Sequence, residues 1–168
     1  VCSRAMKRLT ISSDACIEAL SLLITMAWAD GRLEDHEKEG VRAAAGVFNL
    51  TKELRDRVDS LLQKPLPVEE LLIDTLSAKD KAFMYVAAAW LSGVDDDVDE
   101  KEKQLLAKSA DLLGINDARR VELEQIARDL EPLRKDKASW ASEIVTLFKA
   151  IPARLEGEAS DNVDVAFE

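Results

Sequence analysis

Apolar residues recur along this chain at helical spacing. On the first predicted helix Ile17, Leu20, Ile24 and Ala27 share one face. No run alternates apolar and polar residues between turns, so the pattern predicts no strand. Helices are predicted at about residues 12–29, 34–47, 51–63, 67–76, 82–93, 99–113, 117–130 and 136–151, with the last ending before Pro152. The predicted fold is all-α, with seven or eight helices.

The pattern also repeats itself. The acidic segment Asp30–Glu37 returns as Asp95–Glu102, 65 positions later and without a gap. Thr51, a good helix N-cap residue, falls on Asn116, another good one. The apolar positions Val41, Ala45, Phe48 and Leu50 fall on Leu106, Ala110, Leu113 and Ile115. The repeat predicts two three-helix units, at about residues 15–63 and 80–128, that pack about a pseudo-twofold axis.

The domain boundaries follow from prolines and charge. Pro65 and Pro67 separate the two units, and Pro132 closes the second. One domain is expected over residues 1–154. Beyond Arg154 the charged residues are all acidic, so residues 155–168 are expected to form a disordered acidic tail.

Composition supports the helical prediction. Apolar residues make up 47% of the chain and charged residues 33%, with only 6 Gly and 4 Pro. The longest nearly apolar stretches, Ala15–Ala29 and Ala82–Val94, are shorter than the roughly 20 residues that span a bilayer. Both are therefore predicted to be buried helices rather than transmembrane segments.

The net charge of −10 argues against non-specific binding to nucleic-acid phosphates. It favours cations or basic proteins as partners. Cys2 and Cys16 form no metal or redox motif, and as free thiols they suggest a reducing compartment.

The two acidic turns are the candidate site. If the pseudo-twofold axis brings the turns together, one set of hard oxygen ligands forms from Asp30, Glu37, Asp95 and Glu102. Such ligands favour Ca²⁺ or Mg²⁺ over Zn²⁺. Four converging carboxylates repel one another unless a cation, protonation or separation relieves them. Extra or outer ligands could come from Asp35, Asp97, Asp99 and Glu100.

Helix capping explains the same acids without a metal. Carboxylates in a first helical turn gain roughly 0.3–1 kcal/mol each from the helix dipole, and Asp99 with Glu102 resembles a capping box. The residues alone leave a cation site and pure capping both open. An EF-hand is excluded, because Glu100 stands where its loop needs Gly and Leu106 where it needs Glu.

Two other function classes remain as alternatives. A carboxylate cluster with a metal could activate water, which would make the protein a hydrolase. The sequence offers few catalytic residues. The single histidine, His36, is replaced by Lys101 at the equivalent position of the repeat, and no nucleophile motif or phosphate-binding loop is present. The other alternative is a metal-free scaffold that binds a basic protein partner. Trp28, Trp90 and Trp140 are expected to be core residues.

The segment Ala27–Glu37, with its alanine-rich helix end, Asp-Gly turn and following Glu, resembles the tellurite-resistance TerB family, which also occurs as a domain in membrane-associated DnaJ-like proteins. Its repetition at Val94–Glu102, followed by Leu112–Ile115, extends the resemblance over about residues 15–130. The second turn differs from the first in the Asp-Gly motif, where Asp96 takes the place of Gly31.

The resemblance implies an all-helical fold of two pseudo-symmetric halves with an acidic, metal-binding site at Asp30, Glu37, Asp95 and Glu102. It further implies a non-enzymatic, cytoplasmic module of a bacterial stress-response or tellurite-resistance assembly, with protein partners and peripheral association with the inner membrane.

Overall fold

The computed structural model describes residues 7–28, 35–48, 50–64, 67–71, 73–74, 76–92, 100–130, 140–155 and 163–167. Over these ranges the chain is mostly helical, as predicted. The α-helices are α1 (Ser13–Trp28), α2 (Asp35–Val47), α3 (Lys52–Gln63), α4 (Ala78–Ser92), α5 (Glu100–Leu112), α6 (Asp117–Asp129) and α7 (Trp140–Leu155). The helix expected after Pro67 is a single 3₁₀ turn, η1 (Val68–Glu70).

Side-chain caps fix where α3 and α6 begin. The Thr51 hydroxyl accepts a hydrogen bond from the Leu54 N–H at 3.3 Å, and the Asn116 amide oxygen accepts one from the Arg119 N–H at 2.8 Å. Each cap satisfies an N–H that has no partner inside its helix. The two N-caps predicted from the sequence are therefore confirmed.

Helix starts recur at a constant distance along the chain. α1, α2 and α3 begin at residues 13, 35 and 52, and α4, α5 and α6 begin at 78, 100 and 117, each 65 positions later. The caps of α1 and α4 keep the same spacing, because Ser12 accepts from Ala15 N–H and Ser77 from Asp80 N–H, both at 3.1 Å. These spacings match the 65-residue repeat of the sequence, and the packing of two three-helix units about a pseudo-twofold axis stays a prediction.

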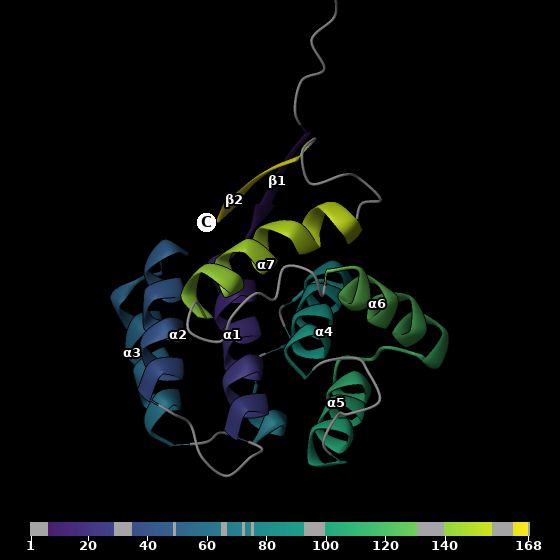
Figure 1. Ribbon diagram of the computed structural model, residues 1–168, viewed down its shortest axis with the longest axis horizontal. Helices are drawn as coiled ribbons and strands as arrows, with labels where there is room; N and C mark the ends of the chain where they lie inside the picture. Colours follow the sequence, from purple (N-terminus) through teal and green to yellow (C-terminus); the bar gives the residue numbers. More distant parts are fainter. Residues whose placement is uncertain are drawn as a thin grey trace, which may run out of the picture.

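Two central helices organise the fold. In Figure 1, α1 and α4 occupy the middle, α2 and α3 lie on the α1 side, α5 and α6 lie beyond α4, and α7 crosses above. Every residue from Ala15 to Met26 and from Ala82 to Trp90 is buried. The prediction that these apolar stretches are buried helices is confirmed over those residues, where α1 packs against α3 and α4, and α4 packs against α5, α6 and α7 as well.

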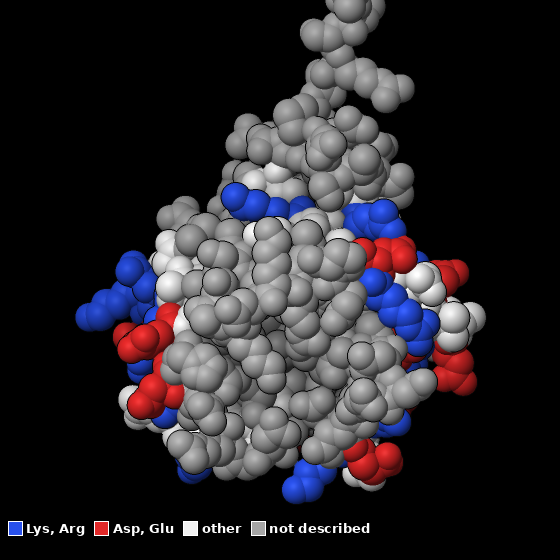
Figure 2. Space-filling view, viewed as in Figure 1, with Lys and Arg blue, Asp and Glu red and all other residues white. Residues whose placement is uncertain are grey.

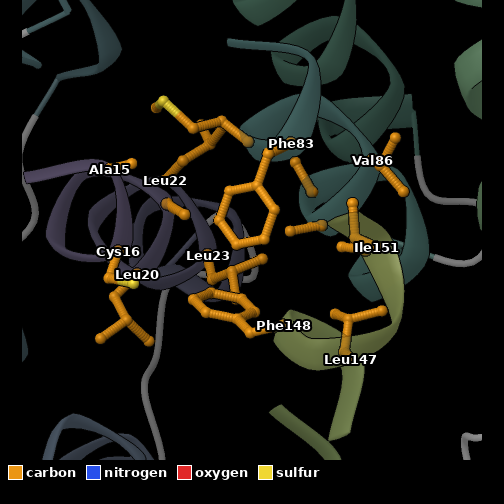
Figure 3. Close-up of a cluster of buried hydrophobic side chains, with 14 of the residues drawn as sticks. Ala15, Cys16, Leu20, Leu22, Leu23, Phe83, Val86, Leu147, Phe148 and Ile151 are labelled. Carbon is orange, nitrogen blue, oxygen red and sulfur yellow. The ribbon is translucent and has the colours of Figure 1, made fainter. Parts of the chain in front are cut away.

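α7 supplies the aromatic centre of the core. The Phe148 ring stacks on Phe48 with centroids 4.9 Å apart, and it meets Phe83 edge-on, also at 4.9 Å. Figure 3 shows Phe83 and Phe148 between α1, α4 and α7, with Leu147 and Ile151 on the α7 side. Each such pair adds roughly 0.5–1.5 kcal/mol beyond the apolar area that it buries, so α7 is an integral part of the domain.

Tryptophans tie each central helix to the end of a neighbour. The Trp28 indole N–H donates to the Leu61 carbonyl at 3.1 Å, and the Trp90 indole N–H donates to the Leu130 carbonyl at 3.0 Å. Both acceptors lie at carboxyl-terminal ends, where helix carbonyls lack partners within the helix. Trp90 is buried and Trp28 half-buried, which agrees with the core role predicted for them, while the Trp140 side chain lies outside those described.

A small parallel sheet corrects the prediction that the chain contains no strand. β1 (Lys7–Ile11) pairs with β2 (Val163–Phe167), with Leu9 opposite Val165. The second strand falls in the tail that was expected to be disordered, so that expectation is wrong for residues 163–167. Burial explains the pairing, because Ile11 joins the main core and Leu9 packs with Ala153 of α7.

α7 also runs further than predicted. This helix was predicted to end before Pro152, yet Pro152 lies inside it and α7 continues to Leu155. A proline inside a helix removes one backbone hydrogen bond and costs roughly 3 kcal/mol. Ile151, Pro152 and Ala153 are all buried, so packing of this turn against the core offsets that loss.

Candidate functional site

The helix ends place the two acidic turns at corresponding junctions. The first turn lies between the end of α1 at Trp28 and the start of α2 at Asp35, and the second lies between the end of α4 at Ser92 and the start of α5 at Glu100. Glu37 is the third residue of α2 and Glu102 the third residue of α5. Their backbones therefore occupy equivalent positions at two helix N-termini, where the dipole favours negative charge.

Most of the predicted ligands lie outside the described residues. This holds for Asp30, Asp95, Asp97 and Asp99, and for the side chains of Glu37, Glu102 and His36. Two of the extra ligands are described: Asp35 and Glu100 are the first residues of α2 and α5, and both are exposed. The convergence of the four main carboxylates stays a prediction.

The described side chains contain no group of three or more His, Cys, Asp or Glu placed to hold a metal ion. That statement does not extend to the four main candidates, whose carboxylates are not among them. For the same reason the capping box proposed for Asp99 and Glu102 stays a prediction.

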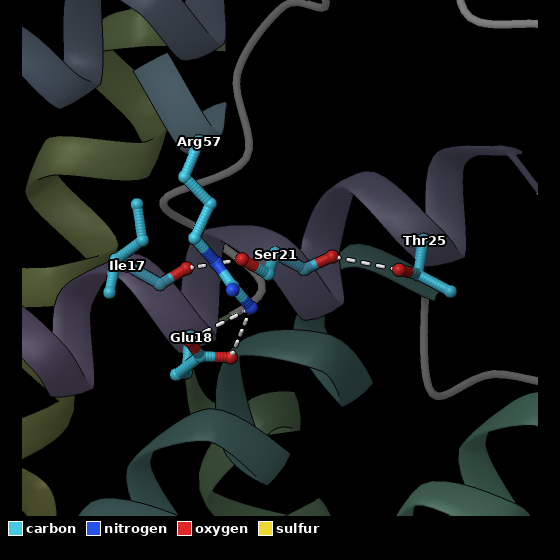
Figure 4. Close-up of polar contacts among 5 residues, drawn as sticks. All are labelled: Ile17, Glu18, Ser21, Thr25 and Arg57. Carbon is cyan, nitrogen blue, oxygen red and sulfur yellow. Dashed lines mark hydrogen bonds and ion pairs between the residues drawn. The ribbon is translucent and has the colours of Figure 1, made fainter. Parts of the chain in front are cut away.

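A buried ion pair, which the sequence analysis did not predict, joins α1 to α3. The Arg57 Nη2 lies 3.1 Å from Glu18 Oε1 and donates to Glu18 Oε2 at 3.2 Å. The Glu18 side chain is only 3% exposed, while that of Arg57 is 26% exposed. Figure 4 shows the guanidinium of Arg57 reaching across to α1, beside Ser21. The signal available in the sequence was Glu18 itself, an acid within a nearly apolar stretch.

This pair continues a polar stripe along α1. Ser21 donates to the Ile17 carbonyl at 2.7 Å and Thr25 donates to the Ser21 carbonyl at 2.9 Å (Figure 4). Hydroxyls that bond back to their own helix are satisfied without any outside partner. Among these groups only the Glu18–Arg57 pair joins α1 to α3, and Arg57 Nε is buried there without a hydrogen-bond partner among the described residues.

A second polar cluster joins α4 to α6. The Tyr85 hydroxyl donates to Glu124 Oε1 at 2.8 Å and accepts from Arg120 Nε at 2.9 Å. Burial, followed by the hydrogen bond to Glu124, raises the pKa of Tyr85 above its usual range. Tyr85 is fully buried, so this cluster is a bridge between helices rather than a site open to substrate.

Cys16 offers no nucleophile. It lies buried in α1, and burial followed by the charge of Asp80 raises its thiol pKa to about 12. A thiol is reactive only as the thiolate, so Cys16 is a core residue at neutral pH.

The described surface shows no face of a single charge sign in the view of Figure 2, where basic and acidic residues lie side by side on both flanks. None of the described helices is both long and apolar enough to cross a membrane.

One family model matches most of the chain. It is described as protein of unknown function, DUF533, and it matches residues 10–127. The match includes both acidic turns and ends within α6. No curated protein and no solved structure matches the chain.

Proposed function

This chain belongs to the DUF533 family, which is TerB-like, and we propose that it is a non-enzymatic module that binds a divalent cation between its two acidic turns. The ligands in this proposal are Asp30, Glu37, Asp95 and Glu102, and the ion is Ca²⁺ or Mg²⁺ in preference to Zn²⁺, because the donors are all carboxylates.

One observation carries the proposal. The helices on either side of the two turns begin at positions 13 and 35 in the first half and at 78 and 100 in the second, so each turn joins a central helix to the helix that follows it. Because α1 and α4 pack directly against each other, a pseudo-twofold axis between them would relate the two turns. Under that symmetry Asp30 corresponds to Asp95 and Glu37 to Glu102.

Electrostatics gives the cation its role. Two carboxylates about 4 Å apart repel by roughly 4 kcal/mol at an effective dielectric constant of 20. Four such groups in one site destabilise the domain unless a cation neutralises them. An ion that binds only the folded form then stabilises it by RT ln(1 + [L]/Kd). In this proposal the module is held in its binding-competent form by the ion.

The resemblance to TerB supports a place for the module in a stress-response or tellurite-resistance assembly. We propose that it acts in the cytoplasm through protein partners, with peripheral contact to the inner membrane. The acidic chain, of net charge −10, would repel a tellurite anion from its acidic turns. Any part in resistance would therefore come from the assembly rather than from capture of tellurite at the acidic turns.

Calorimetric titration of Ca²⁺ and Mg²⁺ into chelator-stripped protein tests the proposal. The wild type is expected to bind, and the Asp30→Asn/Asp95→Asn variant is expected to lose binding. The matched control is Asp56→Asn/Asp111→Asn, which removes the same charge from two exposed positions on α3 and α5.

Two results would count against a cation site. If neither protein binds and the variant is folded, the acids serve as helix caps. If the control variant loses as much affinity as the turn variant, the ion responds only to the overall charge. In the first case a partner pull-down that weakens with salt would favour the metal-free scaffold. Phosphoester turnover that disappears in Glu102→Gln would favour the hydrolase.

A further inference from the structure

A surface hollow lies at the other end of α4 from its acidic turn. It has a volume of about 580 Å³ and is lined by the first turns of α4, by the segment between α5 and α6, and by Leu155 at the end of α7. Pockets that hold small molecules in proteins usually measure roughly 300–1,000 Å³. The hollow is thus large enough for a small organic ligand.

The charged residues that the structure describes along its lining are all basic. Lys79 and Lys81 reach it from α4 and Arg119 from α6, and no acidic residue is among the described lining residues. This contrasts with a chain that carries 33 acidic and 23 basic residues. The three cationic side chains contribute a positive field to the hollow, which Asp80, Asp117 and Glu122, the partner of Arg119, partly offset, and such fields concentrate anions.

The backbone adds to this field. Both α4, which begins at Ala78, and α6, which begins at Asp117, present their N-terminal turns to the hollow. Helix N-termini carry a partial positive charge and leave N–H groups without intrahelical partners. Asp80 and Asp117 offset part of this charge, so the lysines and the arginine are the main attraction for an anion.

Arg119 can exchange its present partner for a ligand. Its Nη1 lies 2.8 Å from Glu122 Oε2, and both side chains are exposed, at 45% and 63%. Exposed pairs of this kind contribute little stability, so a ligand anion competes with Glu122 at small cost. Beside the basic groups, Leu113, Ile115 and Leu155 provide an apolar wall.

We infer that this hollow binds a small phosphate monoester, with the phosphate against Lys81 and Arg119 and the apolar part of the molecule against Leu113 and Ile115. Planar guanidinium groups bind phosphate oxygens through paired hydrogen bonds, and lysine adds a compact charge. No sequence pattern links these residues, because Lys81 and Arg119 lie 38 positions apart and the packing of α4 against α6 brings them to one hollow. This inference does not depend on the proposed cation site.

The test uses phenyl phosphate as the probe, with inorganic phosphate and phenol as its two separated halves. Calorimetry is expected to show the tightest binding for phenyl phosphate, weaker binding for inorganic phosphate and none for phenol. If phenol binds as well as phenyl phosphate, or if phenyl phosphate does not bind by about 10 mM, the inference fails.

Variants then locate the site. Lys81→Met/Arg119→Gln is expected to weaken phenyl phosphate binding about tenfold or more. The control Lys52→Met/Arg55→Gln removes the same charge from exposed positions on α3 and should leave binding unchanged. If both variants weaken phenyl phosphate binding equally, the binding depends only on the net charge of the protein, and the inference is overturned.

A measurement on the unmodified protein covers the case in which the first variant does not fold. Backbone amide NMR shifts during phenyl phosphate titration should be largest at Gly114, Ile115 and Arg119, which all line the hollow. Shifts that centre elsewhere would overturn the inference.

Discussion

The buried ion pair between Glu18 and Arg57 provides a quantitative test of the fold. Replacing Arg57 with Met keeps much of the apolar stem and removes the guanidinium that contacts both oxygens of Glu18, at 3.1 and 3.2 Å. The carboxylate then stays where its side chain is only 3% exposed. A buried charge that loses its partner destabilises the folded state, because water cannot replace the lost interaction.

The expected cost follows from the exposures. Removing one partner of a fully buried pair costs roughly 3–5 kcal/mol. Arg57 is 26% exposed, so water already screens part of this pair, and about 2–4 kcal/mol is the expected loss of unfolding free energy. For a chain of this size, 1 kcal/mol corresponds to a shift in Tm of roughly 2–4 °C. The variant should therefore melt about 4–16 °C below the wild type.

Urea denaturation at neutral pH is the assay. The control is Arg42→Met, because Arg42 pairs with Asp59 at the same 3.1 Å but with side chains 48% and 51% exposed. Its loss should stay below about 1 kcal/mol. Equal losses for Arg57→Met and Arg42→Met would refute the reasoning.

Three further predictions concern single residues. Gly114 has φ = +69° and Gly46 is helical, and an added Cβ meets no atom within 4 Å at either position. Gly114→Ala should therefore destabilise the protein by about 1 kcal/mol, whereas Gly46→Ala should stabilise it by about 0.5–1 kcal/mol. Urea midpoints that move in the same direction for both variants would contradict this. Cys16 in a Cys2→Ser background should not react with a thiol reagent at about pH 8 until the protein unfolds. Because burial raises its pKa from 9.0 to about 12, the unfolded chain loses this proton first, so stability should fall as pH rises from 9 towards 12, less so in Cys16→Ala. Tyr85→Phe should cost about 1–3 kcal/mol, because it removes the hydroxyl between Glu124 and Arg120, and an unchanged urea midpoint would contradict that bridge.

Local features of the fold were predictable from the sequence. Thr51 and Asn116 act on N–H groups three residues away, so their capping role can be recognised without knowing what surrounds the helix. The buried character of α1 and α4 followed from long apolar stretches. These predictions depend only on neighbours in sequence.

Long-range features were not predictable in this way. β1 and β2 pair across about 150 residues of chain, and five-residue strands carry too little pattern to indicate such a partner. Val163, Val165 and Phe167 do alternate with Asp164 and Ala166, a weak strand signal that the acidic composition of the tail obscured. The helix stop predicted at Pro152 failed because tertiary packing outweighed local preference.

The two candidate sites also differ in how far the sequence alone could predict them. The acidic turns stand out in sequence because they repeat, and their place at two helix junctions could be predicted from that repeat. The basic hollow combines residues from α4, α6 and the end of α7, and no sequence spacing indicates that combination. Repetition shows which residues correspond, and only the packing shows which residues meet.

The measurement that tests the central claim most directly is calorimetry of the two single variants, Asp30→Asn and Asp95→Asn, with the ion that the wild type binds. If the two turns form one shared site, the wild type binds one ion per chain and either substitution alone removes most of the affinity. If instead each variant keeps half of the bound ions at unchanged affinity, the turns bind independently and the shared site is contradicted.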